Sequence, residues 1–264
     1  MMIVMTILIL FALAVMGRRG HKDLAQLRKW KYAHRGLHND QLPENSMAAF
    51  KAALEHGYGI ELDLHLLRDG NLAVMHDSAL KRTTGADGII EDLTTAELKN
   101  YRLNGTEETI PTFQQVLELY DGKAPMVIEL KPVKGNHAAL TAKTVEMMAG
   151  YKGLYCMESF DPRVVFWLKK NRPDICRGQL TENHFAAKGK IPAVLKFALT
   201  HQLLNFLTMP DFVAYKFADR KTVSNFLVRK LWGVQGVTWT LKTMEEYNTA
   251  VKEGWIPIFE DFKP

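Results

Sequence analysis

The hydrophobic positions along the chain follow two different spacings. Eight short, nearly continuous apolar runs are typical of buried parallel strands, and the seven longer stretches between them show the periodicity of amphipathic helices. The expected strands cover residues 31–33, 59–64, 126–130, 154–158, 175–180, 212–215, 234–238 and 256–259. The expected helices cover residues 46–55, 113–120, 137–149, 163–170, 193–204, 221–231 and 244–252. This alternation predicts an α/β fold whose strands close into a (β/α)8 barrel of the TIM type, with an N-terminal apolar helix outside it.

A further apolar run over residues 71–75 does not fit this alternation. The residues before it, Arg68-Asp69-Gly70, are typical of a tight turn, so we expect the second strand to extend above the barrel, reverse and return antiparallel as a β-hairpin. The reversal would bring His76 back to nearly the height of Asp63 at the barrel mouth. Residues 78–110 then form an excursion over the mouth, which is typical of a lid or a substrate-contacting segment.

The N-terminal residues 2–16 are almost wholly apolar and carry no charge. This run is slightly shorter than the ~20 residues that span a bilayer comfortably. Basic residues follow it directly, namely Arg18, Arg19, Lys22, Arg28, Lys29 and Lys31. We therefore expect a transmembrane or signal-anchor segment over residues 1–17, a basic juxtamembrane linker over 18–30 and a barrel domain over 31–264.

The same basic flank indicates on which side of a membrane the barrel would lie. Because positive flanks stay in the cytoplasm, the favoured arrangement is an uncleaved anchor with the barrel on the cytoplasmic face. No basic stretch precedes the apolar run as it does in secretory signals, although Ala12-Leu13-Ala14 is compatible with a cleavage site. A cleaved signal peptide, with the barrel outside the cytoplasm, is the alternative.

Composition sets the scale of the molecule and the class of its partners. The 264 residues, of which 47% are apolar and 24% charged, suffice for one large core the size of a single barrel. The net charge of +5 comes largely from the basic flank, so a membrane is expected as a partner and nucleic acid is not. The two cysteines, Cys156 and Cys176, fall within expected strands, which indicates buried, reduced thiols rather than a disulfide or a zinc site.

Polar blocks stand where the expected strands end or the expected helices begin. These blocks are His34-Arg35-Gly36, Pro43-Glu44-Asn45-Ser46, Glu61-Leu62-Asp63, His76-Asp77, Glu129-Leu130-Lys131 and Trp239-Thr240. In a parallel barrel they converge on one mouth. Glu61 and Asp63, two positions apart, point to the same side of their strand, and together with Glu129 they would repel one another unless a cation lay between them. Oxygen ligands favour Ca²⁺ or Mg²⁺ over zinc, so we expect one divalent cation.

The remaining polar residues at the mouth suit proton transfer and phosphate binding. His34 and His76 can divide the roles of general base and general acid near neutral pH. Arg35 and Lys131 flank the carboxylates and can neutralise phosphate oxygens. Asp77 follows His76 too closely to be assumed its partner and is expected to cap the next turn. The full set indicates metal-assisted hydrolysis of a phosphodiester.

From Lys31 to Glu260 the chain resembles the glycerophosphodiester phosphodiesterase family, whose pattern runs HRG, PEN(T/S), E-x-D, HD, ELK and WT. The resemblance implies a barrel that hydrolyses glycerophosphodiesters to sn-glycerol 3-phosphate and an alcohol. It also implies a role for each motif residue: His34 and His76 as the acid/base pair, Glu61, Asp63 and Glu129 as metal ligands, Arg35 and Lys131 as phosphate-binding cations, Glu44 as an orienting group beside His34 and Arg35, and Trp239 as the aromatic wall of the glycerol pocket.

The chain departs from the family pattern at a few positions. His65, on the strand face of Glu61 and Asp63, is interpreted as a mouth-lining residue in preference to an additional metal ligand. Lys242 replaces a common asparagine, and the closing residues 258–264 follow the family only loosely.

Two other functions remain open. One is phospholipase D-like hydrolysis of lysophospholipids, which a membrane anchor beside the site would favour. The other is a catalytically silent membrane protein that binds phosphate esters. The intact pair His34 and His76 argues against the silent protein, because a binding module needs no proton-transfer pair.

Overall fold

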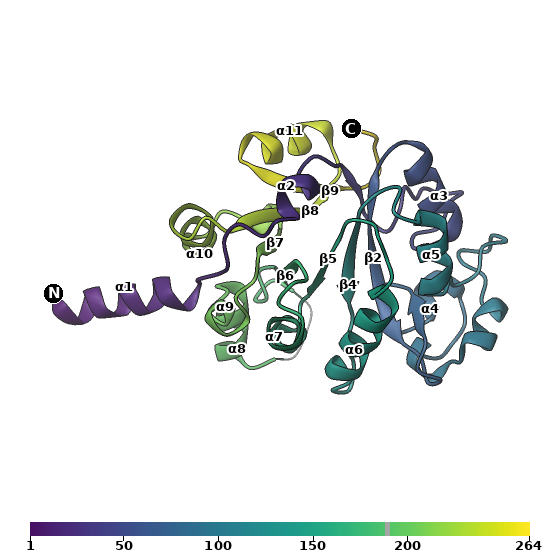
Figure 1. Ribbon diagram of the computed structural model, residues 1–264, viewed down its shortest axis with the longest axis horizontal. Helices are drawn as coiled ribbons and strands as arrows, with labels where there is room; N and C mark the ends of the chain where they lie inside the picture. Colours follow the sequence, from purple (N-terminus) through teal and green to yellow (C-terminus); the bar gives the residue numbers. More distant parts are fainter. Residues whose placement is uncertain (188–190) are drawn as a thin grey trace.

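Eight parallel strands close into a barrel in the computed structural model, which describes residues 1–187 and 191–264 (Figure 1). The barrel strands are β1 (Tyr32–Ala33), β2 (Gly59–Leu66), β4 (Met126–Leu130), β5 (Tyr155–Ser159), β6 (Arg177–Thr181), β7 (Phe212–Lys216), β8 (Gln235–Leu241) and β9 (Trp255–Phe259). The short strand β1 completes the closure, because it pairs in parallel with both β2 and β9. The prediction of a (β/α)8 barrel is confirmed.

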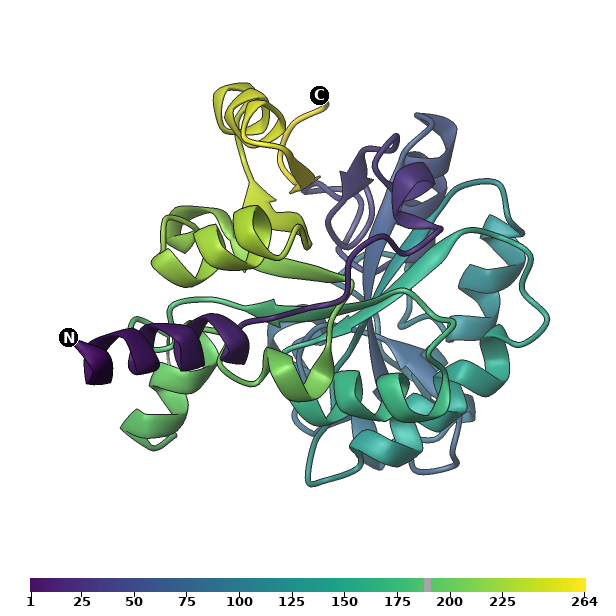
Figure 2. The ribbon, with the colours of Figure 1, turned by 60° about the vertical axis from the view of Figure 1, so that its left-hand side comes forward.

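Helices surround the barrel on its outside (Figure 2). They are α3 (Met47–Glu55), α5 (Phe113–Tyr120), α6 (His137–Met148), α7 (Pro162–Asn171), α8 (Ala193–Thr200), α9 (Asn205–Thr208), α10 (Val223–Phe226) and α11 (Met244–Lys252). Local sequence explains several of their starts. The Ser46 hydroxyl accepts the Ala49 amide at the start of α3, and Thr112 forms a capping box with Gln115 at the start of α5.

Two expected helices are interrupted. The helix expected over residues 193–204 stops after α8 and resumes as α9, because Gln202 adopts a left-handed backbone with φ of 58°. The buried Gln202 amide donates to Asn225 Oδ1 at 2.7 Å, which ties this break to α10. The helix expected over 221–231 begins as α10 and continues as the π-helical turn Leu227–Leu231. Amphipathic spacing alone did not predict these tertiary contacts.

The expected hairpin is present above the barrel. Strand β3 (Leu72–Val74) runs antiparallel to the end of β2, with Leu64 opposite Val74, and Gly70 takes the left-handed φ of 81° at the turn. The amide of Met75 donates to the carbonyl of Asp63 at 3.1 Å. His76 is thereby returned to the height of Asp63, as predicted.

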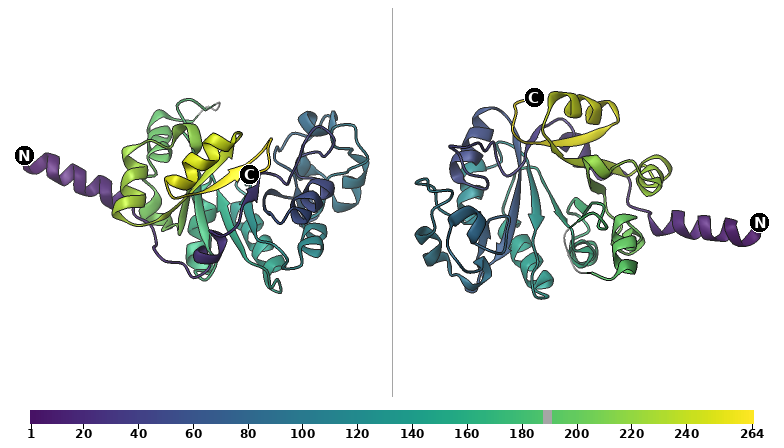
Figure 3. Two further views of the ribbon diagram at one scale, coloured as in Figure 1. Left: turned by 90° about the horizontal axis from the view of Figure 1, so that it is seen from above. Right: turned by 180° about the vertical axis from the view of Figure 1, so that it is seen from behind.

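The excursion over residues 78–110 is a packed unit and contains the short helix α4 (Lys81–Thr84). It has an apolar core of its own, formed with the hairpin and centred on Leu67, Leu80, Ile90, Leu98 and Ile110. The excursion lies to one side of the barrel with α3 and α5 (Figure 3). Its position is therefore fixed by packing against the hairpin that carries His76.

The N-terminal apolar run forms α1 (Met2–Ala14), which projects away from the barrel (Figures 1 and 3). Across the described ranges, no helix is both long enough and apolar enough to cross a membrane, so the expected spanning segment is not supported by the structure. The segment expected as a linker, residues 18–30, is folded against the barrel. Its short helix α2 (Leu24–Leu27) buries both Leu24 and Leu27.

Candidate active site

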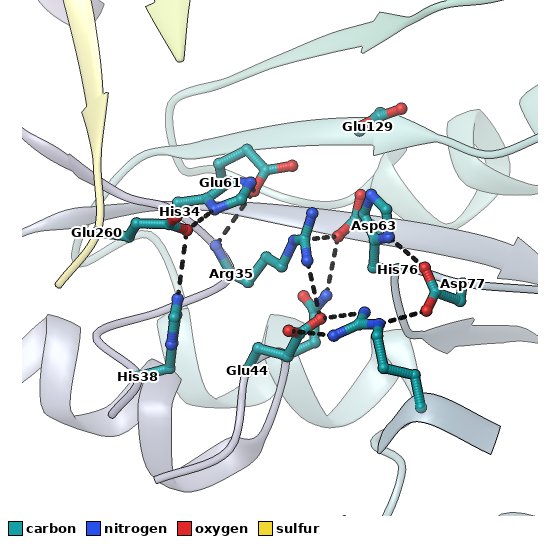
Figure 4. Close-up of polar contacts among 12 residues, drawn as sticks. His34, Arg35, His38, Glu44, Glu61, Asp63, His76, Asp77, Glu129 and Glu260 are labelled. Carbon is teal, nitrogen blue, oxygen red and sulfur yellow. Dashed lines mark hydrogen bonds and ion pairs between the residues drawn. The ribbon is translucent and has the colours of Figure 1, made fainter. Parts of the chain in front are cut away.

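A pocket of about 380 Å³ lies at the carboxyl ends of the barrel strands. Of the residues predicted to be functional, its lining includes His34, Arg35, Glu61, His76, Glu129, Lys131 and Trp239. Asp63 and Glu44 do not line the pocket but contact residues that do. The structure therefore gathers all nine predicted site residues at one mouth (Figure 4 shows most of them).

Three carboxylates form a tight, buried cluster. Glu61 and Asp63 come from β2, Glu129 from β4, and the register places Asp63 beside Glu129. One oxygen from each lies within 4.8 Å of the others, and their exposed fractions are 3%, 0% and 5%. Burial and the neighbouring negative charges raise the pKa of Glu61 well above its ordinary value and that of Glu129 to about 7. A cation would relieve this repulsion.

A fourth carboxylate, Glu158 at the pocket wall, was not predicted. It lies on β5 opposite Glu129, it is buried, and its Oε2 has no hydrogen-bond partner among the described residues. Burial, followed by the charge of Glu129, raises its pKa well above the ordinary range. Its position at the end of an expected strand was a usable signal. An unsatisfied buried carboxylate beside an all-oxygen cluster fits a site for a hard divalent cation.

Two cations balance the charge of Asp63. Lys131 Nζ lies 3.1 Å from Asp63 Oδ1 and 2.8 Å from Glu129 Oε1, and Arg35 Nε lies 3.5 Å from Asp63 Oδ2. Burial alone would raise the pKa of Asp63, but the charges of Lys131, His76 and Arg35 hold it well below its ordinary value. Asp63 is therefore ionised at neutral pH, whereas Glu129 is poised to bind or lose a proton.

The loop after β1 brings Arg35 to the mouth. Arg35 has a left-handed φ of 53°, and its backbone amide donates to Glu61 Oε2 at 3.1 Å. The next residue, Gly36, has φ of 81°, and a Cβ there would lie 2.9 Å from the backbone of Ala49. Only glycine fits this close approach to α3, so the backbone geometry requires Gly36 after His34-Arg35.

Glu44 contacts Arg35 and also reaches the excursion. Its Oε1 accepts from Arg35 Nη1 at 2.9 Å, and its two oxygens accept from Arg82 at 2.7 and 2.8 Å. Arg82, on α4, also donates through Nε to Asp77 Oδ2 at 2.5 Å. Arg82 thus links the Arg35 side of the mouth to the His76 side, a role that sequence reasoning missed because Arg82 stands in no motif.

His34 is held by Glu260, which directly follows the last strand, β9. Its Nδ1 lies 2.5 Å from Glu260 Oε2, while its Nε2 faces the pocket 3.8 Å from Glu61 Oε2 (Figure 4). Glu260 also pairs with Lys242, whose Nζ is 2.8 Å from Oε1. Burial outweighs the contact with Glu260 and lowers the pKa of His34, so the imidazole is neutral near pH 7.

His76 is held by its own neighbour. Its Nδ1 lies 2.6 Å from Asp77 Oδ1, so Asp77 is its side-chain partner. The expected turn cap is not observed, because the described contacts of the Asp77 carboxylate are with His76 and Arg82. Burial lowers the pKa of His76 to about 4.

His65 lies outside the carboxylate cluster, because its Nδ1 contacts Glu91 Oε1 at 2.5 Å and its Nε2 lies 3.2 Å from the His76 carbonyl oxygen. His65 does not line the pocket, so its interpretation as a mouth-lining residue was wrong: its ring is held between Glu91 and the His76 carbonyl.

One wall of the pocket is apolar. It consists of Phe160, Leu180, Trp239 and Ile258, and the rings of Phe160 and Trp239 meet edge to face with centroids 5.7 Å apart. The ionic groups complete the lining, and Lys131 Nζ lies 6.0 Å from the centroid of the Phe160 ring. The pocket is therefore suited to a molecule with an anionic part and an apolar or hydroxylated part.

Comparison with known proteins agrees with this geometry. A model of the glycerophosphoryl diester phosphodiesterase family matches residues 34–263. A glycerophosphodiester phosphodiesterase of Bacillus altitudinis is 43% identical over 108 residues, which are 38% of this chain and 43% of the relative. One from Caldanaerobacter subterraneus is 36% identical over 141 residues, 50% of this chain and 55% of the relative. The matches thus span about half the length of these relatives.

A solved structure extends the comparison over most of the barrel. The phosphodiesterase of Oleispira antarctica, determined with its product sn-glycerol-3-phosphate, is 26% identical with a TM-score of 0.71. The superposition covers 88% of this chain and 92% of that one. Since the family model matches nearly the whole barrel and its motif residues share one pocket, the chain belongs to the glycerophosphoryl diester phosphodiesterase family.

Proposed function

We propose that this protein hydrolyses glycerophosphodiesters to sn-glycerol 3-phosphate and an alcohol. One observation carries the proposal: two histidines, two cations, Glu61 and Glu129 line a single pocket of about 380 Å³, and Asp63 joins the two glutamates in one carboxylate cluster. Each group matches one requirement of phosphodiester cleavage, namely proton transfer, cation binding or charge neutralisation.

Glu61, Asp63 and Glu129 would hold one divalent cation, Ca²⁺ or Mg²⁺. Their proximity, their burial and the raised pKa values of Glu61 and Glu129 support this assignment. When bound, the cation supplies Lewis-acid stabilisation of charge on the phosphate oxygens. Without a cation, Lys131 and Arg35 neutralise the carboxylate cluster. With a cation bound, they would be available to the substrate phosphate.

The two histidines would move the protons. In this mechanism the 2-hydroxyl of the substrate's glycerol attacks phosphorus, and water then opens the cyclic phosphate. One histidine takes the proton of that hydroxyl at its free Nε2, and the other, protonated at Nε2 when the substrate is bound, gives that proton to the leaving alcohol. The two roles reverse when water opens the cyclic phosphate, which restores both rings. Glu260 contacts Nδ1 of His34, and Asp77 contacts Nδ1 of His76. These contacts leave Nε2 of each ring available. Arg35 and Lys131 would stabilise the added charge on phosphorus oxygens.

The proposal is tested by product analysis with the purified full chain. Glycerophosphocholine, glycerophosphoethanolamine and glycerophosphoglycerol are incubated with Ca²⁺, with Mg²⁺ or with a chelator, and ³¹P NMR follows the products. Formation of sn-glycerol 3-phosphate is expected, and an analogue that lacks the 2-hydroxyl should not be cleaved. Binding of these esters without turnover would instead identify the catalytically silent protein.

Phospholipase D-like hydrolysis of lysophospholipids is the second candidate. The apolar wall formed by Phe160, Leu180 and Trp239 favours it, because an acyl or alkyl chain would find apolar contacts there. The same assay with lysophosphatidylcholine decides between the two. Release of choline with lysophosphatidate, at a higher kcat/KM than release of sn-glycerol 3-phosphate from glycerophosphocholine, would favour the second candidate.

We also propose that residues 1–17 attach the protein to a membrane, with the barrel on the cytoplasmic face. The uncharged run over residues 2–16 and the positive flank that begins at Arg18 support this proposal. An alkaline phosphatase fused after Pro264 tests it: an inactive fusion with an intact N-terminus is expected. Active fusion protein, or a mature N-terminus near Val15, would place the barrel outside the cytoplasm.

A further inference from the structure

Large apolar side chains are exposed on the barrel around the place where α1 leaves it. Six of them, which we call the collar, lie on α8, α9, α10 and the following π-helical turn: Val194, Phe197, Phe206, Val223, Phe226 and Leu231. Val194 is 82% exposed and Val223 is 68% exposed. Helix α1 projects from between α9 and α10 in Figure 1, and Figure 3 shows the same neighbours from two other sides. The elements that carry the collar therefore lie on two sides of the base of α1.

The base of α1 is fixed to the barrel. Val15 is fully buried against Val213 and Val228, and the indole Nε1 of Trp232 donates to the carbonyl of Ala12 at 2.7 Å. On the other side, the ring of Phe11 lies 6.3 Å from that of His201, which in turn packs 4.5 Å from the collar residue Phe197. These contacts hold α1 and the collar in one orientation relative to each other.

Helix α1 is apolar around its whole circumference. Thr6 is its one polar residue, and the Thr6 hydroxyl is bonded to the carbonyl of Met2 at 3.0 Å. Residues on every face are exposed, among them Ile3, Leu8 and Leu10. A protein groove would cover one face of such a helix, whereas a helix that is apolar all round is normally surrounded by apolar material. The surroundings that suit it are the hydrocarbon of a lipid bilayer.

Charge around the collar agrees with a lipid partner. The stretch from Ile191 to Val234 contains six basic residues and two acidic ones. Two of the basic residues, Lys216 and Arg220, pair with Glu182 and Glu253. Asp211 is buried against Arg18, and Asp219 accepts the amide of Asn183. Lys221 and Lys230 are exposed beside the collar, and neither forms an ion pair with another described residue. A positive border around an apolar surface complements the headgroups of anionic phospholipids.

We propose that the collar and α1 together form a docking surface for an anionic phospholipid bilayer, which holds the barrel in one fixed orientation. The inference rests on the proposed membrane attachment and adds that the barrel itself enters the interface through α8, α9 and α10. A second copy of this chain is the rival occupant, and the experiment below distinguishes it.

The test uses the full chain, reconstituted from mild detergent into vesicles of phosphatidylcholine with a minority of phosphatidylglycerol. Single cysteines carrying an environment-sensitive fluorophore are introduced by Phe206→Cys and Phe226→Cys in the collar, by Leu8→Cys in α1 and by Met244→Cys as a control. Met244 is 48% exposed on α11, outside the collar, and the native cysteines Cys156 and Cys176 are buried. A blue shift and quenching by lipid-borne quenchers are expected at positions 8, 206 and 226, but not at 244.

The other outcomes distinguish docking of the collar from attachment through α1 alone. A shift at position 8 alone would show that only α1 enters the bilayer and would overturn the proposal that the collar docks on it. No shift at any position would overturn the membrane attachment as well. A blue shift at 206 and 226 without vesicles, accompanied by a dimer in analytical ultracentrifugation, would assign the surface to a second copy.

Charge variants provide an independent measurement. Val223→Glu with Phe226→Glu changes exposed side chains, so the fold should persist, and vesicle partitioning is expected to fall roughly tenfold. The matched control, Met244→Glu with Val251→Glu, changes two exposed apolar residues of α11 and should partition like the unmodified chain. Lys221→Gln with Lys230→Gln should weaken the dependence on phosphatidylglycerol. Equal partitioning of the collar and control variants would overturn the proposal.

Discussion

His34 Nδ1 lies 2.5 Å from Glu260 Oε2, although 226 residues separate the two in the sequence. The other carboxylate oxygen of Glu260 lies 2.8 Å from Lys242 Nζ. Lys242 and Glu260 both stand where the chain departs from the family pattern. Lys242 replaces the common asparagine, and Glu260 lies in the loosely matching end, so the two departures contact each other. The result is a fixed imidazole ring whose Nε2 faces the pocket, since Nδ1 is occupied by the carboxylate.

Glu260→Ala should lower kcat roughly tenfold or more with little change in KM, because His34 loses the partner that fixes its ring and tautomer. Glu260→Gln keeps an acceptor for Nδ1 and should recover part of the loss. Nitrogen NMR of the His34 ring reports the tautomer directly. An unchanged kcat and an unchanged His34 spectrum in Glu260→Ala would show that this contact has no positioning role. Glu245→Ala, an exposed change on α11, is the control.

His76→Ala should lower kcat by roughly 10² or more while substrate binding is largely retained, as expected for a proton-transfer group. His34→Ala should behave in the same way. His56→Ala, at the exposed end of α3, serves as the control. Steady-state kinetics with glycerophosphocholine separates kcat from KM. A near-normal kcat for His76→Ala would remove His76 from the chemistry and leave it a structural role in the hairpin.

Activity should require a divalent cation, because Glu61, Asp63 and Glu129 cannot share the mouth with an anionic phosphate without one. Replacement of each by Ala should abolish turnover, and the isosteric changes Glu61→Gln and Asp63→Asn should do so with the barrel intact by circular dichroism. Exhaustive chelation followed by addition of Ca²⁺ or Mg²⁺ measures the dependence and identifies the ion. Full activity in the chelated protein would contradict the metal assignment.

Affinity for the cation should rise with pH up to about 7, because burial and neighbouring charges raise the pKa of Glu129 to about 7 and a bound cation must displace that proton. The same raised pKa means that the folded metal-free protein binds more protons than the unfolded chain. The stability that Glu129 contributes should therefore fall as the pH rises from about 4.5 to about 7, whereas the lowered pKa of His76 acts in the opposite direction between about 4 and 6.5.

Calorimetric titration in buffers of different ionisation enthalpy measures the proton release on cation binding. Glu129→Gln should release fewer protons than the unmodified protein. Equal release by the two proteins, or none by either near pH 6, would show that Glu129 is ionised before the cation arrives.

Removal of residues 2–10 should leave an active barrel with an almost unchanged Tm, because these side chains do not pack on it. Removal of residues 1–17 also deletes Val15, which is fully buried against Val213 and Val228, and should lower the Tm by about 5 °C. Differential scanning calorimetry of the two truncated chains makes the comparison. Equal Tm values would show that Val15 contributes little to the barrel.

The barrel was predictable because its signals are local. Apolar runs gave the strands, and Arg68-Asp69-Gly70 gave the hairpin that returns His76 to the mouth. The predicted ligands Glu61, Asp63 and Glu129 meet because strand ends in a parallel barrel must meet. Nothing beyond the spacing of residues along the chain was needed for these conclusions.

Two site residues that were not predicted from the sequence, Arg82 and Glu260, take their roles from contacts between segments that are far apart in the chain. Arg82 reaches Glu44 across 38 residues and Glu260 reaches His34 across 226, and neither distance leaves a local pattern in the sequence. The break at Gln202 likewise depends on Asn225, which lies on another helix. Amphipathic spacing cannot report such partners, because it records which side of a helix is apolar and not what that side meets.

The closure of the barrel by β1, which pairs with both β2 and β9, sets the order in which the catalytic centre can be completed. The carboxylates of β2 and β4 can come together as soon as residue 130 has been synthesised, but His34 acquires its partner Glu260 only when β9 has docked. Ribosomes deliver this strand last, so a nascent chain or an N-terminal fragment would hold a cation cluster without an oriented histidine. An oriented His34 is thereby restricted to molecules in which β9 has docked.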